Sequence, residues 1–223
     1  MKQYVVLFTI LFFNQCYIAF AQGAFIDRKQ NAIGLELGKS LASQISPYFV
    51  HSGFSFNGFI DVGIGYSSGT ILKNHDLVYD LSAMGIAFDF TLILVKPTVK
   101  LQPFGLAVNL GYNDFKYERL NVNYIPDKKE YQSNVSTPAL IFYSLSEIDD
   151  NRIVIAFALG YSVTSGAVEG KYLESNFISL GLSADISHEF TPTLLGTWGF
   201  GVGYANESLS AGVSIGLIYK TKI

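Results

Sequence analysis

Large apolar residues alternate with small ones along four short segments of this chain. In the clearest segment, Trp198 to Tyr204, every second residue is large and apolar and each residue between them is glycine. A period of two places the apolar side chains on one face of a β-strand and the glycines on the other. The pattern therefore predicts strands with one strongly apolar face and one nearly bare face.

The same alternation occurs three more times and closes each time on a Gly-Tyr pair. These copies are Val62 to Tyr66, Val108 to Tyr112 and Phe157 to Tyr161. The tyrosines lie too far apart for neighbouring strands of about ten residues, but their spacing suits every second strand. Strands that run in one direction would then end in a common aromatic girdle. The predicted girdle consists of Tyr66, Tyr112, Tyr161, Tyr204 and Trp198.

The bare face of these strands distinguishes a membrane barrel from a soluble sheet. A strand face that meets water usually carries polar side chains, whereas here it carries mostly Gly, Ala and Ser. A membrane barrel fits, because its outward face meets lipid, its narrow interior admits small side chains and tyrosine lies at the membrane interface. The pattern predicts an all-β, closed, antiparallel up-and-down transmembrane β-barrel. The alternative, a soluble barrel that binds apolar ligands, requires the apolar face to point inward.

The alternation divides the chain into ten strands. They are Ala32 to Lys39, Pro47 to Phe56, Phe59 to Ser67, Val78 to Leu94, Phe104 to Asn113, Val135 to Leu145, Arg152 to Val163, Ser175 to His188, Thr193 to Tyr204 and Ser208 to Lys220. An even number is what a bacterial barrel with both ends on one side requires. Eight strands are the alternative, either without the first and sixth or with the second and third merged.

The connections predict two different barrel ends. Phe56-Asn57-Gly58 has the composition of a tight hairpin turn with Gly58 in the left-handed conformation. We expect the periplasmic turns at residues 56–58, 95–102, 147–151 and 191–193. The long external loops are expected at Asp114 to Asn134 and Thr164 to Glu174. Four basic residues of the first loop either contact surface lipopolysaccharide or a partner, or are simply solvated: Lys116, Arg119, Lys128 and Lys129.

The N-terminal residues have the order of a secretory signal. Met1-Lys2 is followed by the apolar run Tyr4 to Phe13 and then by Ala19-Phe20-Ala21. A basic start, a short apolar stretch and an A-x-A site predict cleavage after Ala21. Residues 1–21 are therefore expected to be a signal peptide and residues 22–223 the barrel domain. Cys16, the single cysteine, lies within the signal.

Composition excludes two classes of protein. The chain has 15 basic and 18 acidic residues, a net charge of −3 and no basic stripe, so nucleic acid is not an expected partner. Although 49% of the residues are hydrophobic, no stretch after the signal approaches the roughly 20 consecutive apolar residues that a membrane helix needs.

The chain resembles the small outer-membrane β-barrels of Gram-negative bacteria, in particular the porin-like family common in Bacteroidota. The resemblance rests on the signal, the repeated Gly-aromatic strand ends and the hairpin Ser55 to Gly58. It implies an outer-membrane location among lipid and lipopolysaccharide, and recognition by the barrel assembly machinery. One departure is the end of the chain: Ile215, Leu217 and Tyr219 alternate, but the final residue is Ile223 rather than an aromatic one.

Strand parity also predicts which polar side chains point inward. They are Glu36, His51, Asp61, Asp89, Asn109 and Asp185. No lysine or arginine falls at an inward position in the middle of a strand. An acidic interior without bases is costly unless it is wet, protonated or hydrogen-bonded. Two interpretations stay open: a water-filled lumen that favours cations, or a plugged barrel whose acids accept hydrogen bonds.

These observations favour a porin-like or structural barrel, with small solutes or ions as candidate cargo. The alternatives are a non-conducting surface binding or adhesion barrel and, more remotely, an outer-membrane enzyme. An enzyme would need His51 near a lumen serine and a carboxylate. The histidines of the predicted barrel lie at different levels and no His or Cys spacing indicates a metal site. We therefore assign no catalytic residue, metal or cofactor.

Overall fold

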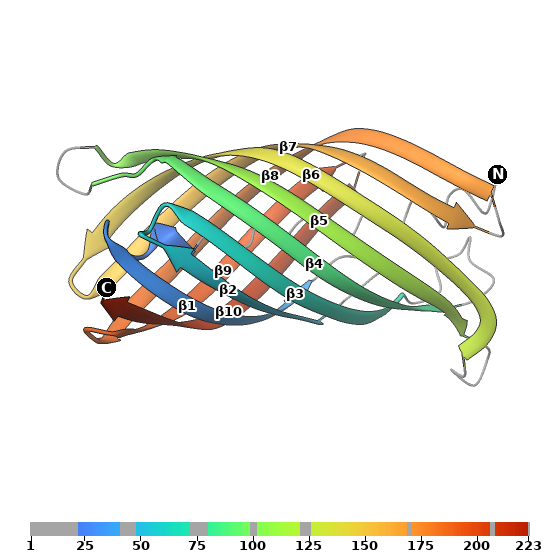
Figure 1. Cartoon of the computed structure of the whole chain (residues 1–223), viewed down its shortest axis with the longest axis horizontal. Coiled ribbons are helices and arrows are strands. Elements are labelled where there is room, and N and C mark those ends of the chain that lie inside the picture. Colours follow the sequence, from blue (N-terminus) through green and yellow to red (C-terminus); the bar gives the residue numbers. More distant parts are fainter. Residues whose placement is uncertain are drawn as a thin grey trace.

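The computed structural model describes residues 22–40, 48–71, 80–98, 102–120, 126–168, 171–205 and 208–222, which form one closed antiparallel barrel (Figure 1). Its strands are β1 (Gln30–Ser40), β2 (Tyr48–Phe56), β3 (Ile60–Ile71), β4 (Asp80–Val95), β5 (Phe104–Leu120), β6 (Pro126–Ile148), β7 (Asn151–Val168), β8 (Lys171–Thr191), β9 (Leu194–Ala205) and β10 (Ser208–Lys222). The 3-10 helix η1 (Gln22–Ala24) precedes them. The predicted signal peptide, residues 1–21, lies outside the described residues.

Closure of the barrel confirms the predicted topology. Each strand pairs antiparallel with its neighbours in sequence, and β1 pairs with β10 from Gln30↔Lys222 to Ser40↔Gly212. β6 has ladders with both β5 and β7, and β2 and β3 are separate strands. The prediction of ten strands is confirmed, and the eight-stranded alternative is wrong.

The apolar face of every strand points outward. In β1, Ile33 and Leu37 are 52% and 46% exposed, whereas Ala32 on the other face is fully buried. The same holds for β9 and β10, where Phe200 and Ile215 are 51% and 57% exposed. An apolar surface that continues around a whole barrel requires a lipid environment. The soluble alternative, with the apolar face inward, is wrong. No helix in the described part of the chain is long and apolar enough to cross a membrane.

The predicted external loops are mostly strand. Residues 114–120 continue β5 and residues 126–134 begin β6, while residues 164–168 and 171–174 belong to β7 and β8. Residues 121–125 and 169–170 are not among the described residues. These extensions lie beyond the lipid-facing part of the barrel, where strands no longer need an apolar outward face, so their polar composition resembled that of loops. The expectation of two long irregular loops is therefore wrong in these ranges.

The opposite end of the barrel, which we call the turn end, carries the tight connections at residues 57–59, 149–150 and 192–193. Asn57 and Gly58 both have positive φ, 53° and 65°, and the Phe59 amide donates a 3.0 Å hydrogen bond to the Phe56 carbonyl. Two successive left-handed residues are typical of a type I′ hairpin turn. The predicted left-handed Gly58 is confirmed.

The hydrophobic core lies inside the turn end. Residues 22–29, which we call the plug, run from η1 inside the barrel to the rim, where β1 begins (Figure 1). Ala24, Phe25 and Ile26 of the plug pack against inward residues of the surrounding strands, including Ile93 and Val154. The core of this protein is therefore the packing of its N-terminal segment within its own barrel.

We expect Gly58→Ala to destabilise the barrel by about 1–3 kcal/mol. A Cβ at this left-handed position is strained and would meet the Lys96 ammonium and the Asp27 carbonyl of the plug. Gly201→Ala is the matched control, because the nearest atom to its Cβ would be 3.7 Å away. Urea unfolding in lipid vesicles measures both. Equal unfolding free energies for the two variants would contradict the role assigned to Gly58.

Candidate functional site

The plug fills the lumen at the turn end with apolar side chains. Phe25 and Ile26 are 3% and 1% exposed, although they belong to a segment that is not part of the barrel wall. Their neighbours are small or aliphatic residues of β1, β4 to β7, β9 and β10 together with Tyr143. Burial of each such side chain contributes roughly 1.5–3 kcal/mol. The plug is thus a packed element rather than a loose tail.

Two charged side chains hold the inner part of the plug. Both carboxylate oxygens of Asp61 accept the Gly23 amide, at 3.2 and 3.1 Å. The Lys96 ammonium donates to the carbonyls of Gly23 and Gly58, at 2.6 and 2.7 Å. Asp61 is therefore inward, as predicted, but it is engaged with the plug rather than facing an open pore.

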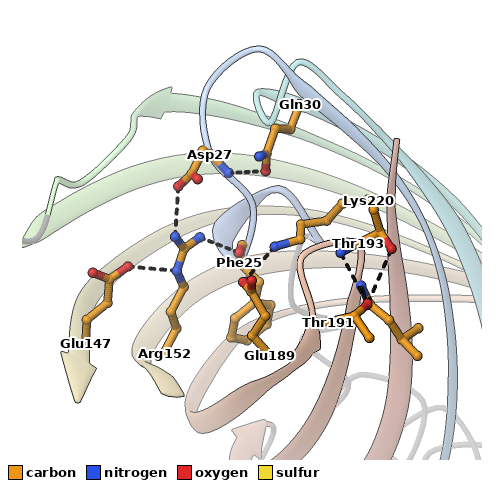
Figure 2. Close-up of polar contacts among 10 residues, drawn as sticks. Phe25, Asp27, Gln30, Glu147, Arg152, Glu189, Thr191, Thr193 and Lys220 are labelled. Atoms are coloured by element: carbon orange, nitrogen blue, oxygen red, sulfur yellow. Dashed lines mark hydrogen bonds and ion pairs between the residues drawn. The ribbon is translucent and has the colours of Figure 1, made fainter. Parts of the chain in front are cut away.

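Arg152, the second residue of β7, clamps the outer part of the plug (Figure 2). Its guanidinium donates to the Phe25 carbonyl at 2.6 Å, to the Asp27 carboxylate at 2.9 Å and to Glu147 at 2.8 Å. Charge-assisted hydrogen bonds of this kind are stronger than neutral ones. Lys220 and Glu189 form a further 2.8 Å ion pair on the neighbouring wall.

A small cavity lies next to the inner end of the plug. Its volume of about 30 Å³ gives room for about two water molecules. The Gln22 side chain lies over Gly34 and Gly53, where a Cβ would collide with it. The polar lining of the cavity consists of Gln22, Glu36, His51, Asp185, Thr197 and Ser214.

The structure pairs two of the predicted lumen residues. His51 of β2 and Asp89 of β4 lie 2.5 Å apart, between Nε2 and Oδ1. Gly63 of the intervening strand makes room for them, because a Cβ there would meet both groups. A histidine held by a carboxylate can act as a base only when a nucleophile is also within reach. Among the described residues, His51 has no hydrogen bond to a serine hydroxyl.

The remaining predicted lumen residues also point inward and have polar partners. Asn109 donates to the Thr91 hydroxyl at 2.8 Å, and Asp185 accepts the Ser183 hydroxyl at 3.0 Å. Glu36 is hydrogen-bonded to Ser214. In the described ranges, no group of three or more His, Cys, Asp or Glu side chains could hold a metal ion. The site is thus a hydrogen-bonded polar layer beside an apolar plug.

Sequence reasoning missed the residues that hold the plug. Phe25 and Ile26 are adjacent apolar residues, so they carry no strand or helix period. Lys96 and Arg152 were expected only as turn and strand-end residues. The one available signal was an apolar pair that follows the predicted cleavage site after three residues, ahead of the polar residues 27–31.

The predicted girdle divides between two levels. Tyr66, Tyr112, Tyr161 and Tyr204 all point outward and are between 41% and 48% exposed. Trp198 also points outward, but it lies nearer the turn end, where its ring packs edge-on against Phe190 with centroids 6.4 Å apart. Such pairs of aromatic levels are typical of the two interfaces of a membrane.

Comparison with solved structures finds similar barrels at very low sequence identity. The β domain of the Bordetella autotransporter BrkA has a TM-score of 0.51 and 8% identity, and the match covers 87% of this chain and 100% of that chain. The translocator domain of the autotransporter NalP from Neisseria meningitidis has a TM-score of 0.49 and 10% identity, covering 88% and 90%. Ail, the attachment invasion locus protein of Yersinia pestis, has a TM-score of 0.43 and 8% identity, covering 86% and 97%.

The similarity to the BrkA domain concerns the fold, that of outer-membrane β-barrels of Gram-negative bacteria, and selects no activity. The finer expectation of a Bacteroidota-type family receives no support from these comparisons. No protein-family model matches the chain, and no curated protein sequence matches it.

We expect the stability of the barrel to rise by on the order of 2–3 kcal/mol between pH 8 and pH 10.5, relative to Lys96→Met. Burial lowers the pKa of Lys96, which follows β4, from 10.5 to about 8, and Asp61 opposes this only in part. In that pH range the unfolded chain binds a proton at Lys96 that the folded chain has released, so higher pH favours folding. Urea unfolding across the range tests this, and parallel pH curves for the two proteins would refute it.

Proposed function

We propose that this protein is an integral outer-membrane β-barrel that its own N-terminal segment closes to ions, and that it acts through the part that projects from the cell. The buried plug carries this proposal. It favours the non-conducting surface barrel over the porin-like channel, although both share the same fold. The polar residues Glu36, Asp89 and Asp185 then serve the closed lumen rather than a solute path.

The lengths of the strands support an orientation with the turn end toward the periplasm. About 9–11 residues suffice for a strand to cross a membrane, and β2 has 9 residues and β1 has 11. β6 has 23 residues and β8 has 21, and both extend away from the turn end (Figure 1). Short turns face the periplasm in bacterial barrels. The plug therefore closes the periplasmic side, and β5 to β8 project outward.

The projecting part is a paired sheet rather than a set of independent loops. The β5 and β6 ladder continues to Leu120↔Pro126, and the β7 and β8 ladder continues to Val168↔Lys171. Its first hairpin carries four basic residues: Lys116, Arg119, Lys128 and Lys129. The same hairpin carries four acids, Asp114, Glu118, Asp127 and Glu130, so it has no net positive charge. Its cations would bind anionic sugar and phosphate groups one by one and not as a basic patch. We propose lipopolysaccharide as the partner of this surface.

In planar bilayers, we expect the refolded protein that begins at Gln22 to insert without steady conductance. Deletion of residues 22–26 should open the lumen and give steps that favour cations, because the interior acids then face water. Phe25→Ala with Ile26→Ala should give brief openings, since it removes apolar packing but keeps the chain.

Ile33→Ala with Ile64→Ala is the matched control, because both side chains face outward. Heat-dependent gel mobility checks that each variant is folded. Steady conductance of the intact protein would contradict the closed barrel.

We expect replacement of the four basic residues by serine to weaken binding of purified lipopolysaccharide at least about tenfold at low salt. The measurement uses the barrel in zwitterionic nanodiscs. Glu118→Gln with Glu130→Gln is the control, because these two acids occupy opposite positions in the register of the same hairpin. Their removal should preserve or strengthen binding. Equal affinities for the intact protein and the serine variant would remove lipopolysaccharide as the partner.

A further inference from the structure

The cavity beside the plug is acidic, and the described cationic side chains of the lumen are engaged elsewhere. Lys96 donates to the Gly23 carbonyl of the plug, Arg152 donates to the Phe25 carbonyl of the plug, and Lys220 pairs with Glu189. Glu36 and Asp185 line the cavity from β1 and β8 without an arginine or lysine in its described lining. Their hydroxyl partners, Ser214 and Ser183, carry no charge. His51 also lines the cavity, but its ring is paired with Asp89. A buried carboxylate with no cationic partner of its own is costly, so a further positive charge would stabilise Glu36 and Asp185 in their charged forms.

Gln22, the first described residue of the plug, lines this cavity. It shares the lining with Glu36 and Asp185, while the next amide, that of Gly23, is held by Asp61. The Gln22 carboxamide is fitted over Gly34 and Gly53. Its Oε1 atom is buried and has no hydrogen-bond partner among the described residues. The residue that lines this polar space is thus also the first residue after the predicted cleavage site.

The direction of the chain matters here. From Gln22 inside the barrel the plug runs outward to Asp27, which Arg152 binds at the rim. The A-x-A pattern predicts cleavage immediately before Gln22. The cleavage site and the inner end of the plug thus coincide.

We propose that processing after Ala21 creates the missing counter-charge: the new α-ammonium of Gln22 forms a buried ion pair with Glu36 and Asp185. This inference rests on the closed barrel proposed above and on removal of the signal before the strands close. A signal peptidase hydrolyses the Ala21-Gln22 peptide bond: water supplies hydroxide to the Ala21 carbonyl carbon and a proton to the departing nitrogen. The resulting amine takes up a second proton near neutral pH.

The ion pair gives processing a structural role. In the unprocessed chain this nitrogen is an uncharged amide, so the two carboxylates have no cation opposite them. After cleavage the terminus both neutralises them and fixes the inner end of the plug. Breaking a buried pair by removing one partner leaves an uncompensated charge, which is strongly destabilising.

The test is a double-mutant cycle between the terminal charge and the two acids. The chain that begins at Gln22 is refolded in lipid vesicles with a free or an acetylated α-amine, each with and without Glu36→Gln plus Asp185→Asn. Acetylation should raise the equilibrium constant for unfolding of the original chain about tenfold or more. In the chain without the acids, only the steric effect of the acetyl group should remain, about twofold or less.

Glu189→Gln is the control, because this acid pairs with Lys220 at the rim and the effect of acetylation should persist there in full. Equal effects of acetylation with and without Glu36 and Asp185 would overturn the proposal. Mass spectrometry of the protein from outer membranes should show a free Gln22 terminus. A pyroglutamyl terminus, formed by attack of the amine on the carboxamide with loss of ammonia, would also overturn it, because that terminus is neutral. Neither result alters the conductance expected of the closed barrel.

Discussion

Closure of the β1 and β10 ladder is the constraint on which the rest of this structure depends. In lipid no water satisfies an unpaired strand edge, so the sheet has to close on itself. A closed barrel of ten strands has a narrow interior, and each strand has one face toward lipid and one toward that interior. The apolar outward residues and the Gly, Ala and Ser of the inward face follow from this geometry. The same closure creates a lumen that something has to fill, and at the turn end the chain fills it with Phe25 and Ile26.

The plug explains how the inward glycines are used. Gly34 and Gly53 accommodate Gln22, and Gly63 accommodates the pair of His51 and Asp89. Each of these positions would collide with its neighbour if it carried a Cβ. The bare strand face is therefore a set of specific spaces for the plug and for the polar layer next to it, and not simply an empty channel wall.

Strand parity and the tight turn could be predicted from the sequence because both are local. The alternation from Trp198 to Tyr204 predicts which side chains of β9 point outward, and Asn57-Gly58 predicts the turn between β2 and β3. The plug could not be predicted in this way, because its partners are distant in sequence: Arg152 reaches Phe25 across 127 positions. The ends of β5 to β8 were also missed, because a polar hairpin outside the membrane has no lipid-facing stripe. For Asp61, parity gave the correct direction but not the partner, since Gly23 lay in a segment with no periodic pattern.

The distribution of charge in the lumen is the reason for proposing a terminal ammonium there. Arginine and lysine side chains act at or near the rim of the turn end, where Arg152 and Lys220 pair with acids that are partly exposed. Deeper in the lumen, among the residues that the structure describes, the acids outnumber the cations, and His51 pairs with Asp89. Long basic side chains need space that this interior lacks once the plug is seated. A terminal ammonium needs almost none, because it adds no side chain, and it can arrive only with the plug. A narrow, plugged barrel can therefore keep an acidic interior if the plug itself carries the positive charge.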